Sequence, residues 1–228
     1  RPMFAARSVL MFAPLPVFAG CQLLPSHTAQ TSVSTAGMIR MQGTLSGDNG
    51  KLFFEPCNEQ RRYAVTDKGN TGVLQEAASV VDKSGKAFAD VRGNFVASRA
   101  QGSDGQADVY QLYRIERPNG ACEDPNFKRL TIHASGNGPK WSLNASGKGL
   151  VLERDGMEPF AVPYLEEQLP EGRFNLVTDA NDQHVELYVA PQRCVDPANG
   201  SVQHLTAELR VNGQVRRGCA YFGALRND

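Results

Sequence analysis

The chain of 228 residues lacks a surplus of charge of either sign, because 24 basic residues are balanced by 24 acidic ones. Without a positive field there is no attraction toward a polyanion, so we expect no nucleic-acid partner. The sequence also lacks an apolar run of the roughly 20 residues that a spanning helix needs. Its N-terminal apolar run, residues 9–20, is interrupted by Pro14 and Pro16, which disfavour a membrane helix.

Motifs of known chemistry are also scarce. No Gly-x-Ser-x-Gly elbow and no Ser-x-x-Lys sequence is present, so no serine nucleophile is indicated. The histidines, at positions 27, 133, 184 and 204, show neither His-x-His nor His-Glu-x-x-His spacing. A metal site built in space from His184 and His204 stays open, although ordinary structural histidines are the preferred interpretation. We therefore expect no catalytic residue, no metal ligand and no cofactor.

Acidic residues offer two further candidates. The dense acidic set could supply the paired carboxylates of a cell-wall or glycan hydrolase, or could simply be a solvated loop; its members are Glu153, Asp155, Glu158, Glu166 and Glu167. The segment 179–182 has the look of a calcium loop, but Ala190 stands where such a loop needs a bidentate glutamate. A turn is expected there instead.

The N-terminus carries the pattern of an export signal. Arg7 precedes the short apolar run, and no acidic residue lies before that run, as in a secretory signal peptide. The sequence Val17-Phe18-Ala19-Gly20-Cys21 resembles a bacterial lipobox, in which the cysteine is acylated and becomes the new N-terminus. The resemblance implies a signal peptide over residues 1–20 and lipid attachment at Cys21. Because Gln22 is not aspartate, it also implies sorting to the outer membrane. A plain signal peptide or a buried apolar segment is the alternative.

Cysteine parity agrees with this interpretation. Five cysteines are an odd number for an exported protein, and four remain if Cys21 carries lipid. Three pairings of those four are open from sequence. Their grouping favours Cys57 with Cys122 and Cys194 with Cys219, one disulfide in each half.

The segment after Cys21 is free of charge. Residues 22–39 contain no Asp, Glu, Lys or Arg and are rich in Ser, Thr, Ala and Gln. Such a composition buries too little apolar surface to offset its ordering entropy. We therefore predict a lipidated flexible tether over residues 21–37, whose role is reach.

Residues 38–122 have the pattern of a small β domain. Strands are predicted near 39–45, 51–55, 61–65, 87–97 and 109–115. One short helix is predicted from Thr71 to Val81, with Leu74, Ala77, Ala78 and Val81 as its apolar positions. The order strand, Phe-Phe-Glu-Pro-Cys, polar turn, Tyr-Ala-Val, helix, Val-Arg-Gly-Asn-Phe and a closing Cys122 resembles the OB-type barrel of the NlpE outer-membrane lipoproteins. The resemblance implies an OB-like fold and a disulfide. NlpE proteins also carry a Cys-x-x-Cys motif linked to copper, which is absent here.

Residues 123–228 show seven or eight short strands separated by turn residues, which predicts a second antiparallel barrel or sandwich. The single predicted strand 202–211 is the longest of them. Trp141, Phe160 and Tyr164 are expected to pack its core. Three landmarks resemble an uncharacterised family of bacterial envelope proteins: Gly138-Pro139-Lys140-Trp141, Arg193-Cys194-Val195-Asp196 and Arg217-Gly218-Cys219-Ala220.

The sequence thus predicts an all-β protein of two small antiparallel barrel or sandwich domains, the first OB-like with one short helix. The expected function is a non-catalytic binding, scaffolding or envelope-sensing lipoprotein on the periplasmic face of the outer membrane. Its expected partners are the bilayer, through acylated Cys21, and an envelope protein or glycan. Loops 102–105 and 179–182 are the expected contact elements. The alternatives are the carboxylate hydrolase and an inhibitor of lysozyme-like enzymes, although no motif of such inhibitors is present.

Overall fold

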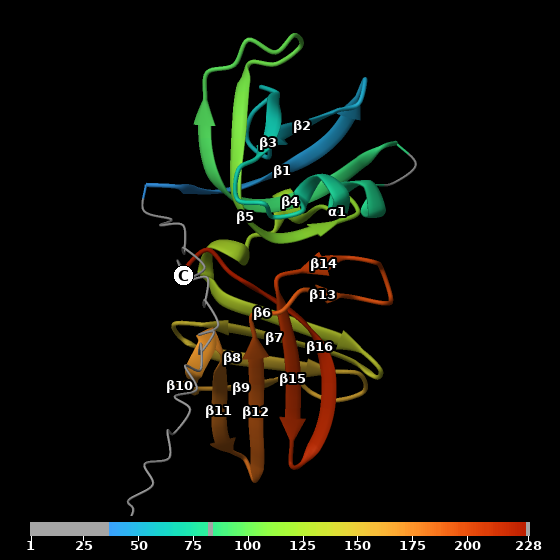
Figure 1. The fold of residues 1–228 in the computed structure, drawn as a ribbon. Coiled ribbons are helices and arrows are strands. Elements are labelled where there is room, and N and C mark those ends of the chain that lie inside the picture. Colours follow the sequence, from blue (N-terminus) through green and yellow to red (C-terminus); the bar gives the residue numbers. More distant parts are fainter. Residues whose placement is uncertain (1–36, 82–83, 227–228) are drawn as a thin grey trace, which may run out of the picture. The chain divides into compact units, whose positions relative to one another are not determined.

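The computed structural model describes residues 37–81 and 84–226, which belong to a single contiguous unit of the chain. In these ranges the chain is all-β apart from one short α-helix and three turns of 3-10 helix (Figure 1). The expected signal peptide (1–20), the lipid site Cys21 and nearly all of the expected tether (21–37) lie outside the described residues. None of the helices in these ranges is long and apolar enough to cross a membrane.

The first sheet closes into a five-stranded barrel. Its elements are β1 (Ile39–Asp48), β2 (Lys51–Pro56), β3 (Tyr63–Asp67), α1 (Val73–Val80), β4 (Lys86–Val96) and β5 (Gly105–Glu116). Strands pair in the order β1-β2-β3-β5-β4, β4 returns to β1, and β3 and β5 are the parallel pair. With the helix between β3 and β4, this is the OB-type arrangement that was expected.

The helix exists as predicted, but of its four predicted apolar positions only Ala77 is buried, and Leu74, Ala78 and Val81 are exposed. Val73, Ala77 and Val80 are buried against the barrel, whereas Leu74 is 43% exposed and Val81 is 37% exposed. Both sets of positions have helical spacing, so periodicity alone does not choose between them. Glu76 lies on the same side of the helix as the buried residues, since its side chain is only 15% exposed, and it pairs there with Arg193 at 2.6 Å.

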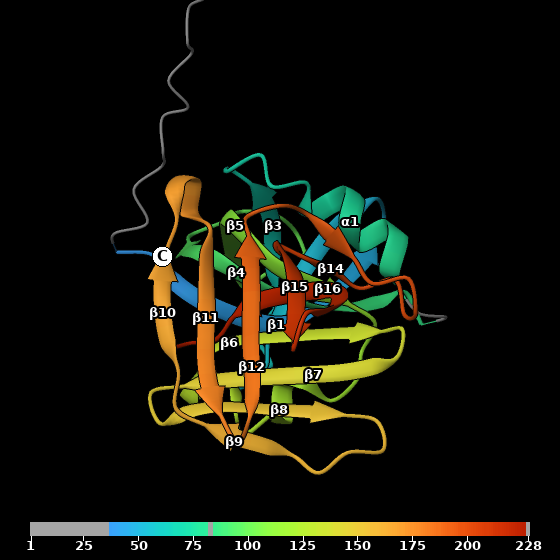
Figure 2. The same ribbon diagram turned by 90° about the horizontal axis from the view of Figure 1, so that it is seen from below.

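The second sheet has nine strands and curls into a half-barrel (Figure 2). Its strands pair in the order β10-β11-β12-β15-β16-β6-β7-β8-β9. Their bounds are β6 (Leu130–Asn137), β7 (Lys140–Ser146), β8 (Gly149–Arg154), β9 (Phe160–Val162), β10 (Leu165–Gln168), β11 (Phe174–Ala180), β12 (Gln183–Ala190), β15 (Leu205–Val211) and β16 (Gln214–Phe222). The 3-10 turns are η1 (Ala121–Glu123), η2 (Phe127–Arg129) and η3 (Pro170–Gly172).

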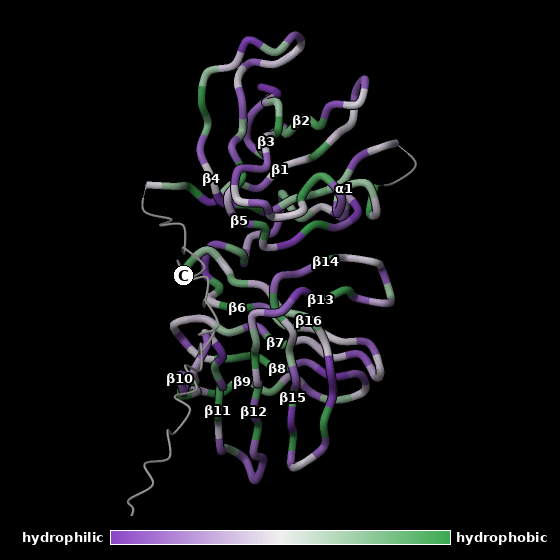
Figure 3. The backbone as a smooth tube through the Cα atoms, viewed as in Figure 1, coloured by the Kyte–Doolittle hydropathy of each residue, from purple (hydrophilic) through white to green (hydrophobic). Residues whose placement is uncertain are grey.

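Hydrophobic and hydrophilic residues alternate along the strands of this sheet (Figure 3), and the buried apolar positions form the second core. In β7, for example, every second residue from Trp141 is buried. Trp141 and Phe160 are core residues and Tyr164 packs against them, which confirms the sequence prediction. A Cβ at Gly218 would overlap the backbone carbonyl of Ser135 on β6 and would also lie 2.9 Å from the Trp141 ring. The close approach of strand and ring therefore requires glycine at that position.

A short hairpin from the C-terminal half adds to the first sheet. It consists of β13 (Cys194–Val195) and β14 (Val202–Gln203), and β14 pairs antiparallel with β5. The predicted strand 202–211 is therefore divided at His204. Gln203 pairs with Arg114 in the first sheet, while Leu205 pairs with Ala220 in the second. The expected boundary near residue 123 separates the strands of the two sheets except for this hairpin.

Both expected disulfides are present. Cys57–Cys122 joins the residue after β2 to η1, and Cys194–Cys219 joins β13 to β16. Their Cα atoms are 5.4 and 5.5 Å apart, within the usual range for the bond. In the chain-entropy model, loops of 65 and 25 residues correspond to about 4 and 3.5 kcal/mol of stabilisation.

Candidate functional site

A polar cavity of about 330 Å³ lies between the C-terminal part of β5 and the second sheet. Its walls come from β5, β14, β6 and β16 and from two loops, residues 119–124 and 196–201. Nearly all of the side chains that line it are polar. A cavity of this kind differs from the mostly apolar pockets that hold drug-like molecules, and it suits a ligand with many hydrogen-bonding groups.

Arg114 and Gln203 form one wall of this cavity. They are register partners on β5 and β14, so their side chains lie next to each other on the same face of the sheet. Both residues are buried, at 4% and 5% exposure. Nη2 of Arg114 and Oε1 of Gln203 have no hydrogen-bond partner, and Nε of Arg114 makes an ion pair but no hydrogen bond. Because buried polar atoms are normally satisfied, this neighbouring donor and acceptor mark the cavity as a candidate binding site.

The remaining nitrogens of Arg114 are held by acidic neighbours. Nη1 donates to Oε1 of Glu116 at 3.3 Å, and Nε lies 3.5 Å from Oδ2 of Asp90. The guanidinium stands 3.9 Å above the ring of Tyr221. Burial lowers the pKa of Arg114, but Tyr221, Glu116 and Asp90 outweigh burial and the pKa is raised. The guanidinium is therefore a fixed, permanently charged donor.

A second arginine, on the other strand that neighbours β4, also binds Asp90. Arg40, on β1, donates through Nε and Nη2 to the two carboxylate oxygens of the fully buried Asp90, at 2.5 and 2.9 Å. Nη2 also donates to the carbonyl oxygen of Phe222 at 2.6 Å, and the guanidinium lies 3.5 Å from the centre of the Tyr113 ring. The Arg40–Asp90 pair thus ties β1 and β4 to β16, beside the cavity.

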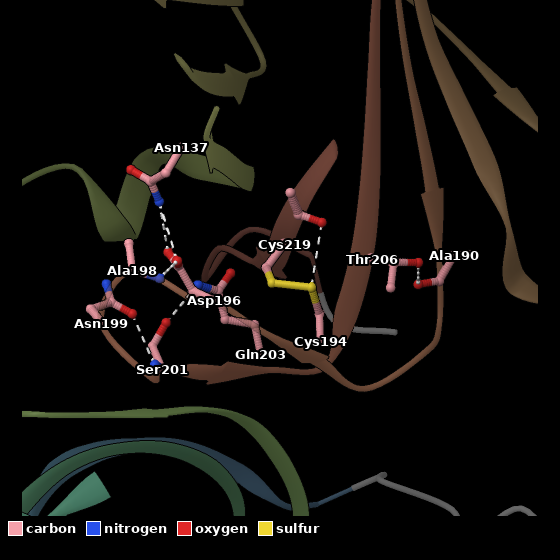
Figure 4. The surroundings of a disulfide bond; sticks show 11 residues. Asn137, Ala190, Cys194, Asp196, Ala198, Asn199, Ser201, Gln203, Thr206 and Cys219 are labelled. Carbon is pink, nitrogen blue, oxygen red and sulfur yellow. Dashed lines mark hydrogen bonds between the residues drawn. A yellow bond between two sulfur atoms is a disulfide. The ribbon is translucent and has the colours of Figure 1, made fainter. Parts of the chain in front are cut away.

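The loop between β13 and β14 forms a second wall (Figure 4). Asp196 accepts hydrogen bonds from Nδ2 of Asn137 at 3.2 Å and from the backbone N–H of Ala198 at 2.8 Å. Its own N–H donates to the carbonyl of Ser201 at 2.9 Å. Nε2 of Gln203 then donates to Oγ of Ser201 at 3.3 Å. The loop is therefore fixed by its own side chains, and Cys194–Cys219 fixes its start on β16.

The rings of His133 and Tyr221 complete the wall of the polar cavity. His133 and Tyr221 lie with their centres 5.0 Å apart. Burial lowers the pKa of His133 and raises the pKa of Tyr221 to about 12, so both are neutral at pH 7. Nδ1 of His133 is 2.6 Å from Oδ1 of Asn144. Since the amide oxygen can only accept, Nδ1 carries the proton and Nε2 is left as an acceptor.

The acidic set singled out in the sequence does not gather in this cavity. Glu153 and Asp155 line another cavity, of about 290 Å³, beside Trp141. Glu166 pairs with Arg226, and Glu158 and Glu167 are exposed. The polar cavity is lined instead by acidic residues that the sequence analysis missed, namely Glu116, Asp124 and Asp196. They are far apart in the chain, and no spacing rule connects them.

The histidines considered as metal ligands have separate environments. His184 is exposed and contacts Asp179 at 2.6 Å and Glu186 at 3.1 Å. His204 instead accepts the N–H of Phe222 at 3.0 Å through Nε2. His27 lies outside the described residues. Among residues 37–81 and 84–226, no group of three His, Cys, Asp or Glu side chains is placed to hold a metal ion.

The two expected contact loops are both hairpin connections. Loop 102–105 joins β4 to β5, and loop 179–182 contains the turn between β11 and β12. Asn181 and Asp182 have φ values of 52° and 58°, as a tight type I′ turn requires. The segment is thus a turn, as expected.

Comparisons with family models, curated proteins and solved structures gave no match. The resemblances to NlpE lipoproteins and to the envelope family remain sequence-based predictions, and the site is interpreted from its own geometry.

Proposed function

We propose that this chain is a lipoprotein on the periplasmic face of the outer membrane, anchored through acylated Cys21, whose β domains act as a non-catalytic binding module. The observation that carries the binding role is the polar cavity with unpartnered atoms of Arg114 and Gln203. Two disulfides support an oxidising compartment. The signal and lipobox pattern at residues 1–21 supports the anchor.

The carboxylates of the cavity favour binding over catalysis. A general acid or base must lie within hydrogen-bond reach of the proton that it transfers. Glu116 already accepts from Arg114 and from Asn119, and Asp196 accepts from Asn137 and Ala198. These carboxylates position neighbouring groups, so the cavity is a rigid recognition surface.

A tether would make weak recognition sufficient. Holding the domains near the bilayer raises their concentration at an envelope target, so modest affinity produces substantial occupancy. The proposal of a tethered binding module therefore predicts that shortening residues 22–37 impairs binding of the envelope target without unfolding the domains.

The second candidate is a glycan hydrolase, favoured by the presence of Glu153 and Asp155 in one cavity beside Trp141. A retaining or inverting glycosidase needs two carboxyl groups flanking a bound sugar. Turnover of wall glycan by the purified protein, abolished in Glu153→Gln and retained in Glu167→Gln, would replace the binding proposal by this one.

Intact-mass spectrometry and membrane fractionation test the anchor. We expect a mature N-terminus at Cys21 that carries acyl chains and a protein that fractionates with the outer membrane. A Cys21→Ser variant should lose both properties. An unmodified mature N-terminus in the parent protein would refute the anchor.

A crosslinking pull-down from intact envelopes, followed by mass spectrometry, tests the binding role. We expect a recurrent protein or glycan partner whose capture falls when Gln203 is replaced by leucine.

A further inference from the structure

The unpartnered pair in the polar cavity specifies what a ligand must offer. Nη2 of Arg114 needs an acceptor and Oε1 of Gln203 needs a donor. Because the two side chains extend from register partners on adjacent strands and both line the cavity, a single ligand can face both. A hydroxyl group, or two neighbouring hydroxyl groups, meets both requirements.

The charge of the lining argues against an anion. Arg114 is the only basic residue on the wall, whereas Glu116, Asp124 and Asp196 are acidic. His133 adds no charge, because burial lowers its pKa. The positive charge of Arg114 is already offset by Glu116 and Asp90. A phosphate or carboxylate would therefore meet net repulsion in a partly desolvated site.

A cation would suit the net charge but not the geometry. It would approach the Arg114 guanidinium, and it would leave the free N–H of Nη2 without an acceptor. Leaving a buried donor unsatisfied costs about 1–3 kcal/mol. A neutral ligand whose groups both donate and accept avoids both penalties.

The other polar groups of the wall extend the same preference. Tyr221 and Ser135 offer hydroxyls, Asn119 offers an amide, and Nε2 of His133 is an acceptor. The volume of about 330 Å³ corresponds to roughly ten water molecules, which is room for one sugar ring with its substituents.

We infer that the polar cavity binds a single neutral saccharide unit, a polyhydroxy ring held between Arg114 and Gln203. This inference rests on the proposed binding function and names the ligand class of that site. Replacing ordered water by a ring that reproduces the same hydrogen bonds would give weak but selective binding.

The test is amide NMR of the mature chain, kept in solution by Cys21→Ser, during titration with methyl glucoside and with methyl N-acetylglucosaminide. Glucose 6-phosphate, glucuronic acid and spermidine serve as the anionic and cationic probes. We expect saturating shifts of the Gln203 side-chain amide and of residues 196–203 with a neutral glycoside. The charged probes should give none.

Two variants localise the binding. Gln203→Leu removes the free acceptor and should weaken the binding of the neutral glycoside by about tenfold, the effect of one lost hydrogen bond. Gln168→Leu, in the exposed strand β10 outside this cavity, should leave the affinity unchanged. Unchanged amide spectra away from the substituted residue show that each variant is folded.

The outcomes separate this inference from the proposed function. Saturating shifts at the cavity with spermidine or an anionic sugar, and none with neutral glycosides, would overturn the ligand class and leave a binding module. No shift with any probe would overturn the cavity as a small-ligand site, while envelope capture by the full protein would still support scaffolding. Neutral-glycoside binding that persists in Gln203→Leu would place the ligand elsewhere and overturn the inference.

Discussion

Replacing His204 by glutamine should remove part of the acid sensitivity of the protein. His204 lies between β14 and β15, where its Nε2 accepts the N–H of Phe222 at 3.0 Å. Its ring meets the rings of Tyr113 and Phe222 edge-on, with centres 5.0 and 4.8 Å away. Burial, assisted by the positive charge of Arg40, lowers its pKa from 6.5 to about 3.

The sign and size of the effect follow from proton linkage. Between pH 6.5 and about 3 the unfolded chain binds a proton at this histidine that the folded chain does not, so stability falls as the pH falls through this window. Each pH unit in the window is worth about 1.4 kcal/mol. From pH 7 to pH 5, His204 alone should therefore reduce the free energy of unfolding by about 2 kcal/mol.

Denaturant unfolding at pH 7 and pH 5, with disulfides intact, measures this loss. Gln retains an acceptor for the Phe222 N–H and does not titrate, so His204→Gln should lose about 2 kcal/mol less than the parent over the same interval. His184→Gln is the control. Asp179 and Glu186 raise the pKa of this exposed histidine, so its contribution is present at low pH and is lost as the pH rises. An equal loss in the parent and in His204→Gln would refute the reasoning.

Three further substitutions test the framework around the site. Arg40→Met should lower the free energy of unfolding by about 3–5 kcal/mol in chemical denaturation, because it leaves the buried Asp90 without its main partner. Arg61→Met removes an exposed ion pair and should lower it by at most about 1 kcal/mol. Gly218→Ala should cost about 1–3 kcal/mol or more, because its Cβ would clash with the backbone carbonyl of Ser135 and crowd the Trp141 ring. Gly147→Ala has open space around the new Cβ and should be nearly neutral. Replacing Cys194 and Cys219 together by alanine should lower the free energy of unfolding by about 3.5 kcal/mol, and no change on denaturant melting would contradict the loop-entropy estimate.

Local patterns carried most of the fold prediction. Alternating residues located the five barrel strands, and the grouping of cysteines anticipated both disulfides. These features depend on neighbours in the chain or on pairs within one half. The helix shows the limit of such patterns, because Leu74 and Val73 both fit a helical stripe and only packing against the barrel selects Val73.

The candidate site depended on contacts that no local pattern encodes. Gln203 appeared to belong to one continuous strand with Leu205, and its transfer to the first sheet requires the β14–β5 pairing. In β5 the structure buries all four residues from Tyr113 to Glu116, although two of them are charged, and the sequence alone does not show this. A strand buried on both faces with charges in it must contact polar groups from elsewhere in the fold. The sequence does not identify those groups.

The β13–β14 hairpin has a consequence for attempts to divide the protein. A fragment ending at residue 122 would leave Arg114 and Ile115 on a bare strand edge, where β14 normally completes the hydrogen bonding. Open edges of this kind invite pairing with other chains, so the isolated barrel should self-associate. Conversely, a fragment beginning at residue 123 would keep the β13–β14 hairpin but would lack β5, the strand with which β14 pairs. In calorimetry the intact chain should therefore melt in one cooperative step, and neither half should serve as an interchangeable module.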